Sequence, residues 1–476
     1  MAKIPEKIKN LSAVFNPSSI AVIGASREPN KIGHVIVKNF VDGGFAGKVY
    51  PINPNAEEIL GLKSYSSVLK VPGKIDSAVI AVPEAAVAGV LEQCGKKGVK
   101  GVVLITGGFS EVGNFEDEKK IAAIANKYGM ALIGPNCMGV LTPASRVDSV
   151  FLPIYKLGRP RVGGISFISQ SGAVGGCIVD LAARAGIGMS KFVSYGNAAV
   201  IDETDLLQYL ASDPDTDIIV VYLEGLRDGR KFLEVAREIT KKKPVVILKA
   251  GKSASGAEAA LSHTGSLAGS AEAYRAAFRQ ANVIEAATLE QLFDFAKIFD
   301  QILPCGGRVG IITNGGGMGV LATDSLEDEG LQLASLSGET KKLLRISLPA
   351  YANARNPLDL VGDADSHRYE VAINAMLRDG NIDMILLIIL FQTAAIDSSV
   401  VNIAIRASDL KKKPIIVVCT GGEYTEMHKR ILESYGIPTY SSPSSAMRAI
   451  SRFLAYSAHY AKHNRTGCPS PLKKSK

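Results

Sequence analysis

One histidine, His263, lies in a stretch whose composition suits a catalytic loop. The stretch runs from Ala260 to Gly269, is rich in Gly, Ser and Ala, and follows an apolar, strand-like run at residues 244–249. A neutral imidazole nitrogen is a good nucleophile near pH 7 and can carry a phosphoryl or acyl group reversibly. Small neighbours let the ring approach a substrate closely and let the loop move. His263 is therefore a candidate nucleophile, although a lone histidine in a loop is more often structural.

Two glycine-rich turns elsewhere in the chain could bind phosphate. Each follows an apolar run and precedes a helical pattern, so its backbone N–H groups would converge on an anion. Tight packing alone can also demand glycine, but two such turns at matching positions, in a chain with a reactive histidine, favour phosphoryl transfer. Serine, threonine and asparagine side chains could add donors. The first turn comprises Ser169, Gln170, Ser171 and Gly172, and the second comprises Thr313, Asn314, Gly315, Gly316 and Gly317.

A third glycine motif is incomplete. Gly251, Lys252 and Ser253 match the end of the triphosphate-binding pattern GxxxxGK[ST], but Val246 stands where its leading glycine belongs. The chain therefore lacks that ATP-binding loop.

The N-terminal part of the chain has the pattern of a nucleotide-binding sheet. Short apolar runs alternate with helical segments, which predicts a doubly wound parallel sheet that binds a ligand at the carboxyl ends of its strands. The NAD fingerprint is absent, because Gly24 is followed by Ala25 and Ser26, and Asn53 stands where an acidic residue should end the second strand. An ADP-containing ligand other than NAD is favoured. The predicted strands cover residues 19–24, 49–52, 78–82, 102–105 and 131–133.

The remainder of the chain contains two similar halves. Residues 161–172 resemble 308–317, residues 217–221 resemble 383–387, and 241–248 resemble 411–418, in the same order. The order predicts two α/β domains of one type. Residues 241–243 and 411–413 are lysine triads, and each precedes a proline and an apolar run. We expect these lysines to be solvated caps at helix or strand ends. We expect domains at 1–145, 146–300 and 301–463, with a disordered tail at 464–476.

Composition excludes several classes of protein. The net charge of +8 suits a polyphosphorylated ligand or an acidic partner, but basic residues are dispersed and no nucleic-acid-binding module is present. The six cysteines lack metal-ligand spacing, which indicates a reduced, cytoplasmic protein. The N-terminus lacks an apolar signal core, and the longest apolar run, residues 384–391, is too short to cross a bilayer.

Three motifs occur in the order found in one known superfamily. They are residues 134–140 (Gly-Pro-Asn-Cys-Met-Gly-Val), 169–172 (Ser-Gln-Ser-Gly) and 262–265 (Ser-His-Thr-Gly). On these motifs the chain, from about Leu11 to Ala461, resembles the α subunits of ADP-forming acetyl-CoA (acyl-CoA) synthetases, in the succinyl-CoA synthetase superfamily. The resemblance implies a Rossmann-like CoA-binding domain followed by two flavodoxin-like ligase domains.

The resemblance also implies roles for individual residues. His263 would be phosphorylated, and Glu224 would orient its imidazole, whereas the simpler interpretation of Glu224 is a strand-end charge facing water. Phosphate would be held by the two glycine turns, and Asn136 would lie near the CoA thiol. The further expected CoA contacts are Gly24, Ala25, Ser26, Asn53, Val82, Pro83, Thr106, Gly107 and Gly108.

The expected reaction is acyl-CoA + ADP + phosphate ⇌ acid + CoA + ATP, through an acyl phosphate and a phosphohistidine. No ATP-grasp domain is recognisable, so the resemblance implies that ADP/ATP and Mg²⁺ bind a separate ATP-grasp β subunit in an α2β2 heterotetramer, and that this chain carries no metal site. Two alternatives remain. One is a non-catalytic, CoA-sensing regulatory subunit, and the other is an NAD(P)-linked oxidoreductase, which the missing fingerprint disfavours.

Overall fold

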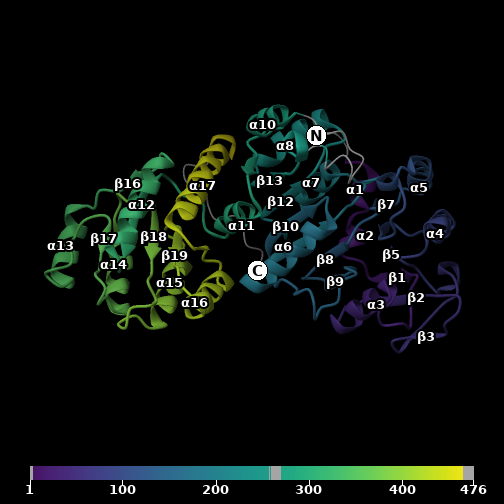
Figure 1. Ribbon diagram of the computed structural model, residues 1–476, viewed down its shortest axis with the longest axis horizontal. Coiled ribbons are helices and arrows are strands. Elements are labelled where there is room, and N and C mark those ends of the chain that lie inside the picture. The colour runs from purple at the N-terminus through teal and green to yellow at the C-terminus, as the bar shows by residue number, and fades with distance from the viewer. Residues whose placement is uncertain (1–3, 257, 259–269, 465–476) are drawn as a thin grey trace. The chain divides into compact units, whose positions relative to one another are not determined.

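The computed structural model describes residues 4–256, 258 and 270–464. They form two compact units, Met1–Arg184 with Gly188–Glu285, and Ala185–Ile187 with Ala286–Lys476 (Figure 1). Each unit is described by itself. His263 lies outside the described residues, as does the expected tail apart from Asn464, which ends the last helix.

The first unit begins with a five-stranded parallel sheet of order β2-β1-β5-β6-β7. Each predicted apolar run forms one of its strands. Every residue of β1 is buried, and its side chains alternate between two hydrophobic clusters, with Ile20 and Val22 in one and Ala21 and Ile23 in the other. The strands are β1 Ser19–Ile23, β2 Lys48–Ile52, β5 Ser77–Ile80, β6 Gly101–Leu104 and β7 Ala131–Ile133.

Helices and a small hairpin surround this sheet. Their bounds are α1 Glu6–Lys9, α2 Ser12–Phe15, α3 Ile32–Asp42, α4 Glu84–Lys97 and α5 Phe115–Lys127, with 3-10 turns η1 Val68–Lys70 and η2 Ser110–Val112, and the hairpin strands β3 Glu58–Ile59 and β4 Leu62–Lys63.

A seven-stranded sheet of order β14-β13-β12-β10-β11-β8-β9 forms the rest of the first unit. Its strands are β8 Gly139–Thr142, β9 Val147–Asp148, β10 Val162–Ser169, β11 Met189–Ser194, β12 Ile218–Leu223, β13 Val245–Lys249 and β14 Ile284–Ala286. Its helices are α6 Gly172–Ala185, α7 Glu203–Ser212, α8 Gly229–Thr240 and α10 Ala271–Gln280. β8 pairs antiparallel with β11, so a segment expected to close the first domain belongs to the sheet of the second.

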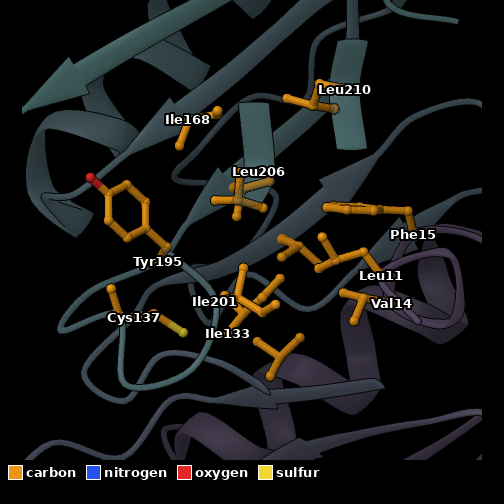
Figure 2. Packing of buried hydrophobic residues seen from close by; sticks show 14 of the residues in the cluster. Leu11, Val14, Phe15, Ile133, Cys137, Ile168, Tyr195, Ile201, Leu206 and Leu210 are labelled. Carbon is orange, nitrogen blue, oxygen red and sulfur yellow. The ribbon is translucent and has the colours of Figure 1, made fainter. Parts of the chain in front are cut away.

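One hydrophobic cluster joins the two sheets of this unit. Leu11 and Phe15, before the first sheet, lie in the same cluster as Leu206 and Leu210 of α7 (Figure 2). Tyr195, which follows β11, also belongs to the cluster, but its hydroxyl points away from the apolar side chains (Figure 2). The two sheets therefore share a core rather than meeting across a linker.

The second unit contains a sheet of order β16-β15-β18-β19-β20, with β17 paired to β15. Numbered within each repeat, both this sheet and strands β11-β10-β12-β13-β14 have the order 2-1-3-4-5, which is the flavodoxin order. The predicted duplication and fold class are thereby confirmed. The strands are β15 Arg308–Thr313, β16 Gln332–Leu333, β17 Leu358–Asp359, β18 Met384–Ile388, β19 Ile415–Val418 and β20 Thr439–Tyr440. The helices are α11 Leu289–Lys297, η3 Ile298–Asp300, α12 Gly316–Asp328, α13 Gly338–Ser347, α14 Ser366–Arg378, α15 Ser399–Asp409, α16 Glu423–Ser434 and α17 Pro443–Asn464.

The third lysine of each triad caps the end of a helix. Lys243 Nζ donates to the carbonyl oxygens of Leu210 and Asp213, at 2.9 and 2.6 Å, at the end of α7. Lys413 makes the same two contacts at the end of α14, at 2.7 and 2.5 Å. Burial lowers the pKa of both ammonium groups. The prediction of caps is confirmed for these two lysines, but they are partly buried rather than solvated.

The cysteines differ from expectation at one position. Cys94, Cys137 and Cys419 are buried free thiols, and burial raises the pKa of each to about 12, while Cys177 is free and exposed. Cys305, however, is disulfide-bonded, so the expectation of a fully reduced chain is wrong at that residue. Within residues 4–464, apart from the gap at 257 and 259–269, no helix has the length and apolar character needed to cross a membrane.

Candidate active site

A cavity of about 680 Å³ lies within the first unit and brings several predicted residues together. It is lined by Asn136, by the turn residues Ser171 and Gly172 at the start of α6, and by Glu203 and Arg227. Asn136 adopts a left-handed backbone conformation, with φ of 57°, directly after the Gly134–Pro135 bond. The residue expected near the thiol and the first expected phosphate turn therefore share one cavity.

A second cavity, of about 600 Å³, lies at the carboxyl ends of the first sheet's strands, where α/β sheets bind ligands. Gly24 has a φ of 93°, and a Cβ placed there would lie 2.2 Å from the carbonyl oxygen of Ala81, so only glycine fits. Ile32 lines both cavities, which places them next to each other. Six of the expected CoA contacts line this cavity: Gly24, Ala25, Ser26, Asn53, Val82 and Pro83.

The loop after β6 contacts residues of both cavities. The Thr106 hydroxyl donates to the carbonyl oxygen of Val82 at 2.7 Å. A Cβ on Gly107 would lie 3.4 Å from Asn136 Oδ1, and Gly108 has a φ of 104°. The structure therefore places Thr106 and Gly107 beside expected CoA contacts, whereas a Cβ on Gly108 would face Glu84.

The first phosphate turn offers backbone rather than side-chain donors. Ser169 is fully buried, and its hydroxyl donates to the carbonyl oxygen of Ser171 at 2.6 Å. Gly172 begins α6 and lines the 680 Å³ cavity together with Ala173. The first N–H groups of a helix have no partner within the helix and carry its positive dipole end. An anion at this position would therefore meet the backbone N–H groups near Gly172 and Ala173. The Ser169 hydroxyl, which was expected as a phosphate donor, is occupied by its hydrogen bond to Ser171.

Gln170 connects the turn to Glu224. Its Oε1 accepts from the backbone N–H groups of Glu224 and Gly225, at 2.8 and 3.0 Å. Glu224 is 8% exposed and follows the last residue of β12. Burial, and then the charge of Glu224, raise the pKa of Tyr222 to about 12. Burial lowers the pKa of Lys249, and the charge of Glu224 acts in the opposite direction. The simpler interpretation of Glu224 as a charge facing water is therefore wrong.

Glu203 is a buried carboxyl group that sequence reasoning missed. It is the first residue of α7, is 2% exposed, and its Oε1 has no hydrogen-bond partner. Burial and then the charge of Asp202 raise its pKa to about 7, against hydrogen bonding from the backbone of Arg227. An acidic residue in the first turn of a helix is ordinarily explained by the helix dipole, so no sequence signal distinguished Glu203.

A polar network fixes the wall of the cavity next to Asn136. The Asn197 amide donates to Glu111 and Glu118, at 2.5 and 3.0 Å. Arg227 donates to Glu118 at 3.3 Å and to the carbonyl oxygen of Asn197 at 2.7 Å. Asn136 Nδ2 reaches Asn197 Oδ1 at 3.4 Å. The network ties the loop and helix after β6 to the loops that follow β11 and β12. Asn197 and Arg227 were not predicted, because their carboxylate partners are distant in the chain.

The second phosphate turn, in the other unit, combines packing constraints with open space. Asn314 donates to Leu390 O at 3.2 Å and accepts from Leu390 N–H at 2.9 Å, so its amide is occupied. A Cβ on Gly315 would lie 2.3 Å from the Leu390 side chain, and one on Gly316 would lie 2.6 Å from a carboxylate oxygen. A Cβ on Gly317 would meet nothing within 4 Å. The atoms nearest to a Cβ on Gly315 or Gly316 are the ends of side chains that can move, and a Cβ on Gly317 would lie in open space.

Comparison with known proteins places these features in one family. Profiles described as a CoA binding domain, a succinyl-CoA ligase like flavodoxin domain and a ligase-CoA domain match residues 18–143, 162–299 and 309–461. A solved structure titled dinucleotide forming acetyl-coenzyme A synthetase 1, from Ca. Korarchaeum cryptofilum, in complex with phosphate and ADP, is 39% identical, with a TM-score of 0.89 and coverage of 96% of this chain and 98% of that one.

Curated relatives show the same family. The α subunit of acetate–CoA ligase [ADP-forming] II from Pyrococcus furiosus is 44% identical over 92% of this chain and 96% of the relative. Acetate–CoA ligase [ADP-forming] I from Archaeoglobus fulgidus is also 44% identical, and this chain spans 64% of its length. The names of these relatives as ligases support the expected catalytic subunit over the alternative of a non-catalytic, CoA-sensing regulatory subunit. The chain belongs to the ADP-forming acetate–CoA ligases of the succinyl-CoA synthetase superfamily and corresponds to their α subunits.

Proposed function

We propose that this chain is the α subunit of a reversible ADP-forming acyl-CoA synthetase: acyl-CoA + ADP + phosphate ⇌ acid + CoA + ATP. One observation carries the proposal. The thiol-side residue Asn136, the start of α6 and the buried carboxyl group of Glu203 line a single cavity, next to a second cavity built from the expected CoA contacts. Gln170 links the α6 turn to Glu224 behind it.

CoA binding is proposed to use both cavities. The nucleotide end would occupy the cavity at the carboxyl ends of β1, β2 and β5, where Gly24 allows close approach of the backbone. The thiol end would enter the 680 Å³ cavity beside Asn136, past Ile32, which lines both. Family profiles at residues 18–143, 162–299 and 309–461 support our division into domains at 1–145, 146–300 and 301–463.

The first chemical step is proposed to occur at the start of α6. Phosphate held by the N–H groups near Ser171 and Gly172 attacks the thioester carbonyl, which gives an acyl phosphate and releases CoA. The glycine turn at the start of α12, where Gly317 leaves space, is proposed as a second anion site within its own unit.

The second step is proposed to use His263. Its imidazole takes the phosphoryl group from the acyl phosphate and releases the acid, and Glu224 positions the ring through one nitrogen. Phospho-His263 then transfers the group to ADP on an ATP-grasp β subunit that also binds Mg²⁺, in an α2β2 heterotetramer. The relatives named as α subunits support a partner subunit. We propose a cytoplasmic location, because the reaction consumes CoA esters and ADP.

ATP formation from acetyl-CoA, phosphate, ADP and Mg²⁺ tests this function. The chain alone should form no ATP, and addition of an ATP-grasp β subunit should restore the reaction. His263→Ala should abolish ATP formation while leaving CoA binding intact in a titration. Full activity of the chain alone would contradict the partner proposal, and substantial ATP formation by the histidine variant would contradict the phosphohistidine route.

A further inference from the structure

The fold satisfies the buried Glu203 carboxyl group only in part, because the backbone N–H of Arg227 hydrogen-bonds to it but one of its oxygen atoms has no partner. Its side chain is 2% exposed, its Oε1 has no hydrogen-bond partner, and it lines the 680 Å³ cavity together with Asn136 and Gly172. A buried polar atom without a partner is costly and rare in folded proteins. A ligand in the cavity would supply the missing partner.

The position of Glu203 is fixed from outside the cavity. Asp205, two residues later in α7, is 1% exposed and accepts from Lys7 at 2.5 Å and from Lys231 at 2.8 Å. Asp202 caps the helix and forms a capping box with Asp205. These contacts fix the backbone of the first turn of α7, from which the Glu203 side chain extends.

The second flavodoxin-like domain shows what this position is like without a function in the cavity. Ser366 is the first residue of α14, directly after the capping residue Asp365, as Glu203 follows Asp202. The Ser366 hydroxyl is paired, because it donates to Asp397 at 2.8 Å. The fold therefore accepts a small, paired polar group at this position, and the carboxyl group with one unpaired oxygen atom belongs to the first copy.

The surroundings of Glu203 favour its protonated form near neutral pH. Burial has the largest effect and Asp202, on the same helix, the next, while Arg227 opposes them through its backbone N–H and its charge. Among the described residues, Tyr195, after β11, and Tyr274, on α10, also interact electrostatically with it. The Tyr195 hydroxyl is also buried and unpaired. No cation in this set forms an ion pair with Glu203.

We propose that Glu203 is the general acid and base for the CoA sulfur, an inference that rests on the proposed function. When phosphate adds to the thioester carbonyl and the C–S bond breaks, the Glu203 carboxyl group donates its proton to the departing sulfur and becomes a carboxylate. In the reverse direction, the carboxylate takes the proton from the CoA S–H as sulfur attacks the carbonyl of the acyl phosphate and phosphate leaves. No other reactant is needed.

The proton affinities of the two groups suit this exchange. A thiol has an ordinary pKa of roughly 8.5, and the pKa of Glu203 is raised to about 7. Proton transfer is most effective when the acid and base titrate near the working pH. A glutamate in water, with an ordinary pKa of about 4.3, would be ionised at neutral pH and would hold no proton to donate to the sulfur.

Two half-reactions, neither of which needs nucleotide, test the proposal on the full-length chain. Transfer of acetyl from acetyl phosphate to CoA requires the sulfur step, whereas phosphorylation of His263 by acetyl phosphate does not. Glu203→Gln should lower kcat of acetyl transfer roughly 10²–10⁴-fold, leave the KM for CoA within about threefold, and leave His263 phosphorylation within about threefold. Glu234→Gln, an exposed carboxylate on α8, is the matched control and should change neither half-reaction.

The pH dependence gives a second measure. In wild type the rate of acetyl transfer to CoA should rise as pH increases through about 7, because the carboxylate is the base, and the Gln variant should lose that rise. Glu203→Asp should recover part of the rate and of the pH dependence. It also provides a second variant if the Gln variant does not fold.

Each possible result of these experiments either supports or overturns the role of Glu203 at the CoA sulfur. Retention of acetyl transfer within threefold, or equal loss of both half-reactions in Glu203→Gln, would overturn the role at sulfur. If wild type itself performs neither half-reaction, the proposed function fails, and the role of Glu203 fails with it. Loss of acetyl transfer alone, with its pH-dependent rise, is the expected result.

Discussion

The two flavodoxin-like domains share one set of scaffold contacts. In the first, the Ser169 hydroxyl donates to the carbonyl oxygen two residues later, and in the second Thr313 does the same. The next residue in each, Gln170 or Asn314, accepts a hydrogen bond from the backbone N–H that follows the adjacent strand, at 2.8 or 2.9 Å. The hydroxyl groups of Ser169 and Thr313 and the Asn314 amide, which were expected as possible phosphate donors, therefore hold the turns together, and the Gln170 amide does the same in the first copy.

The copies differ where charge could do chemistry. The strand registers make Glu224 equivalent to Leu390 and Lys249 equivalent to Cys419. Ser169 pairs with Tyr222 as Thr313 pairs with Ile388, and Tyr222 pairs with Leu248 as Ile388 pairs with Val418. Glu203 likewise corresponds to Ser366, at the start of the helix that precedes β12 or β18. The shared contacts belong to the fold, and the charges at these three positions are present only in the first copy, where we propose that the reaction occurs.

The largest expected effect comes from Glu224. Glu224→Gln should preserve folding and lower turnover of the complete enzyme roughly 10²–10⁴-fold, because the imidazole loses its orienting carboxylate. Leu390→Met, a volume-conserving change at the equivalent position, should leave turnover within about twofold. Steady-state ATP formation measures both. Near-normal rates for the Gln variant would remove the distinction between the copies at this position.

Glu203 should reduce stability at neutral pH. Its pKa is about 7 in the folded chain against an ordinary 4.5, so the folded state binds the proton more tightly. The wild type should therefore lose up to roughly 3 kcal/mol of unfolding free energy as pH rises from about 4.5 to about 7. Glu203→Gln should flatten that dependence and raise the midpoint of thermal unfolding of the first unit at pH 8. An unchanged pH dependence would show that Glu203 ionises normally.

The scaffold amides should matter in both copies. Gln170→Ala leaves the backbone N–H groups of Glu224 and Gly225 without their partner, and Asn314→Ala leaves that of Leu390 without one. Each N–H group left unpaired costs roughly 1–3 kcal/mol. Urea unfolding of each variant, followed by probes within each unit, measures the loss. A loss confined to one copy would show that the contact is not a general feature of the fold.

The smallest expected effects come from the lysine caps. Lys243→Met and Lys413→Met each remove two hydrogen bonds to carbonyl oxygens at a helix end while keeping the apolar stem. We expect roughly 1–2 kcal/mol in each unit, with similar values in the two copies. Unequal losses, measured by the same urea titration, would mean that the two caps are not equivalent.

Local patterns in the sequence were sufficient for the strands and for the lining of the 600 Å³ cavity. Buried parallel strands such as Ser19–Ile23 are continuous apolar runs, and Gly24 is required by local backbone geometry. Tertiary pairing was not visible in the same way. β8 looks like the end of the first domain, yet it pairs with β11, more than 40 residues later. Glu203 resembles an ordinary helix-start acid, and its burial depends on residues from several distant loops.

Labelling with phosphate most directly tests whether the reaction is confined to the first copy. The full-length chain is incubated with acetyl-CoA and labelled phosphate, digested under alkaline conditions, and the acid-labile label is mapped. We expect label on His263 and none on His367 or His428 of the second unit. We also expect no label in the His263→Ala variant and strongly reduced label in Glu224→Gln. Acid-labile label on a histidine of the second unit, or undiminished label in the His263 variant, would contradict a reaction confined to the first copy.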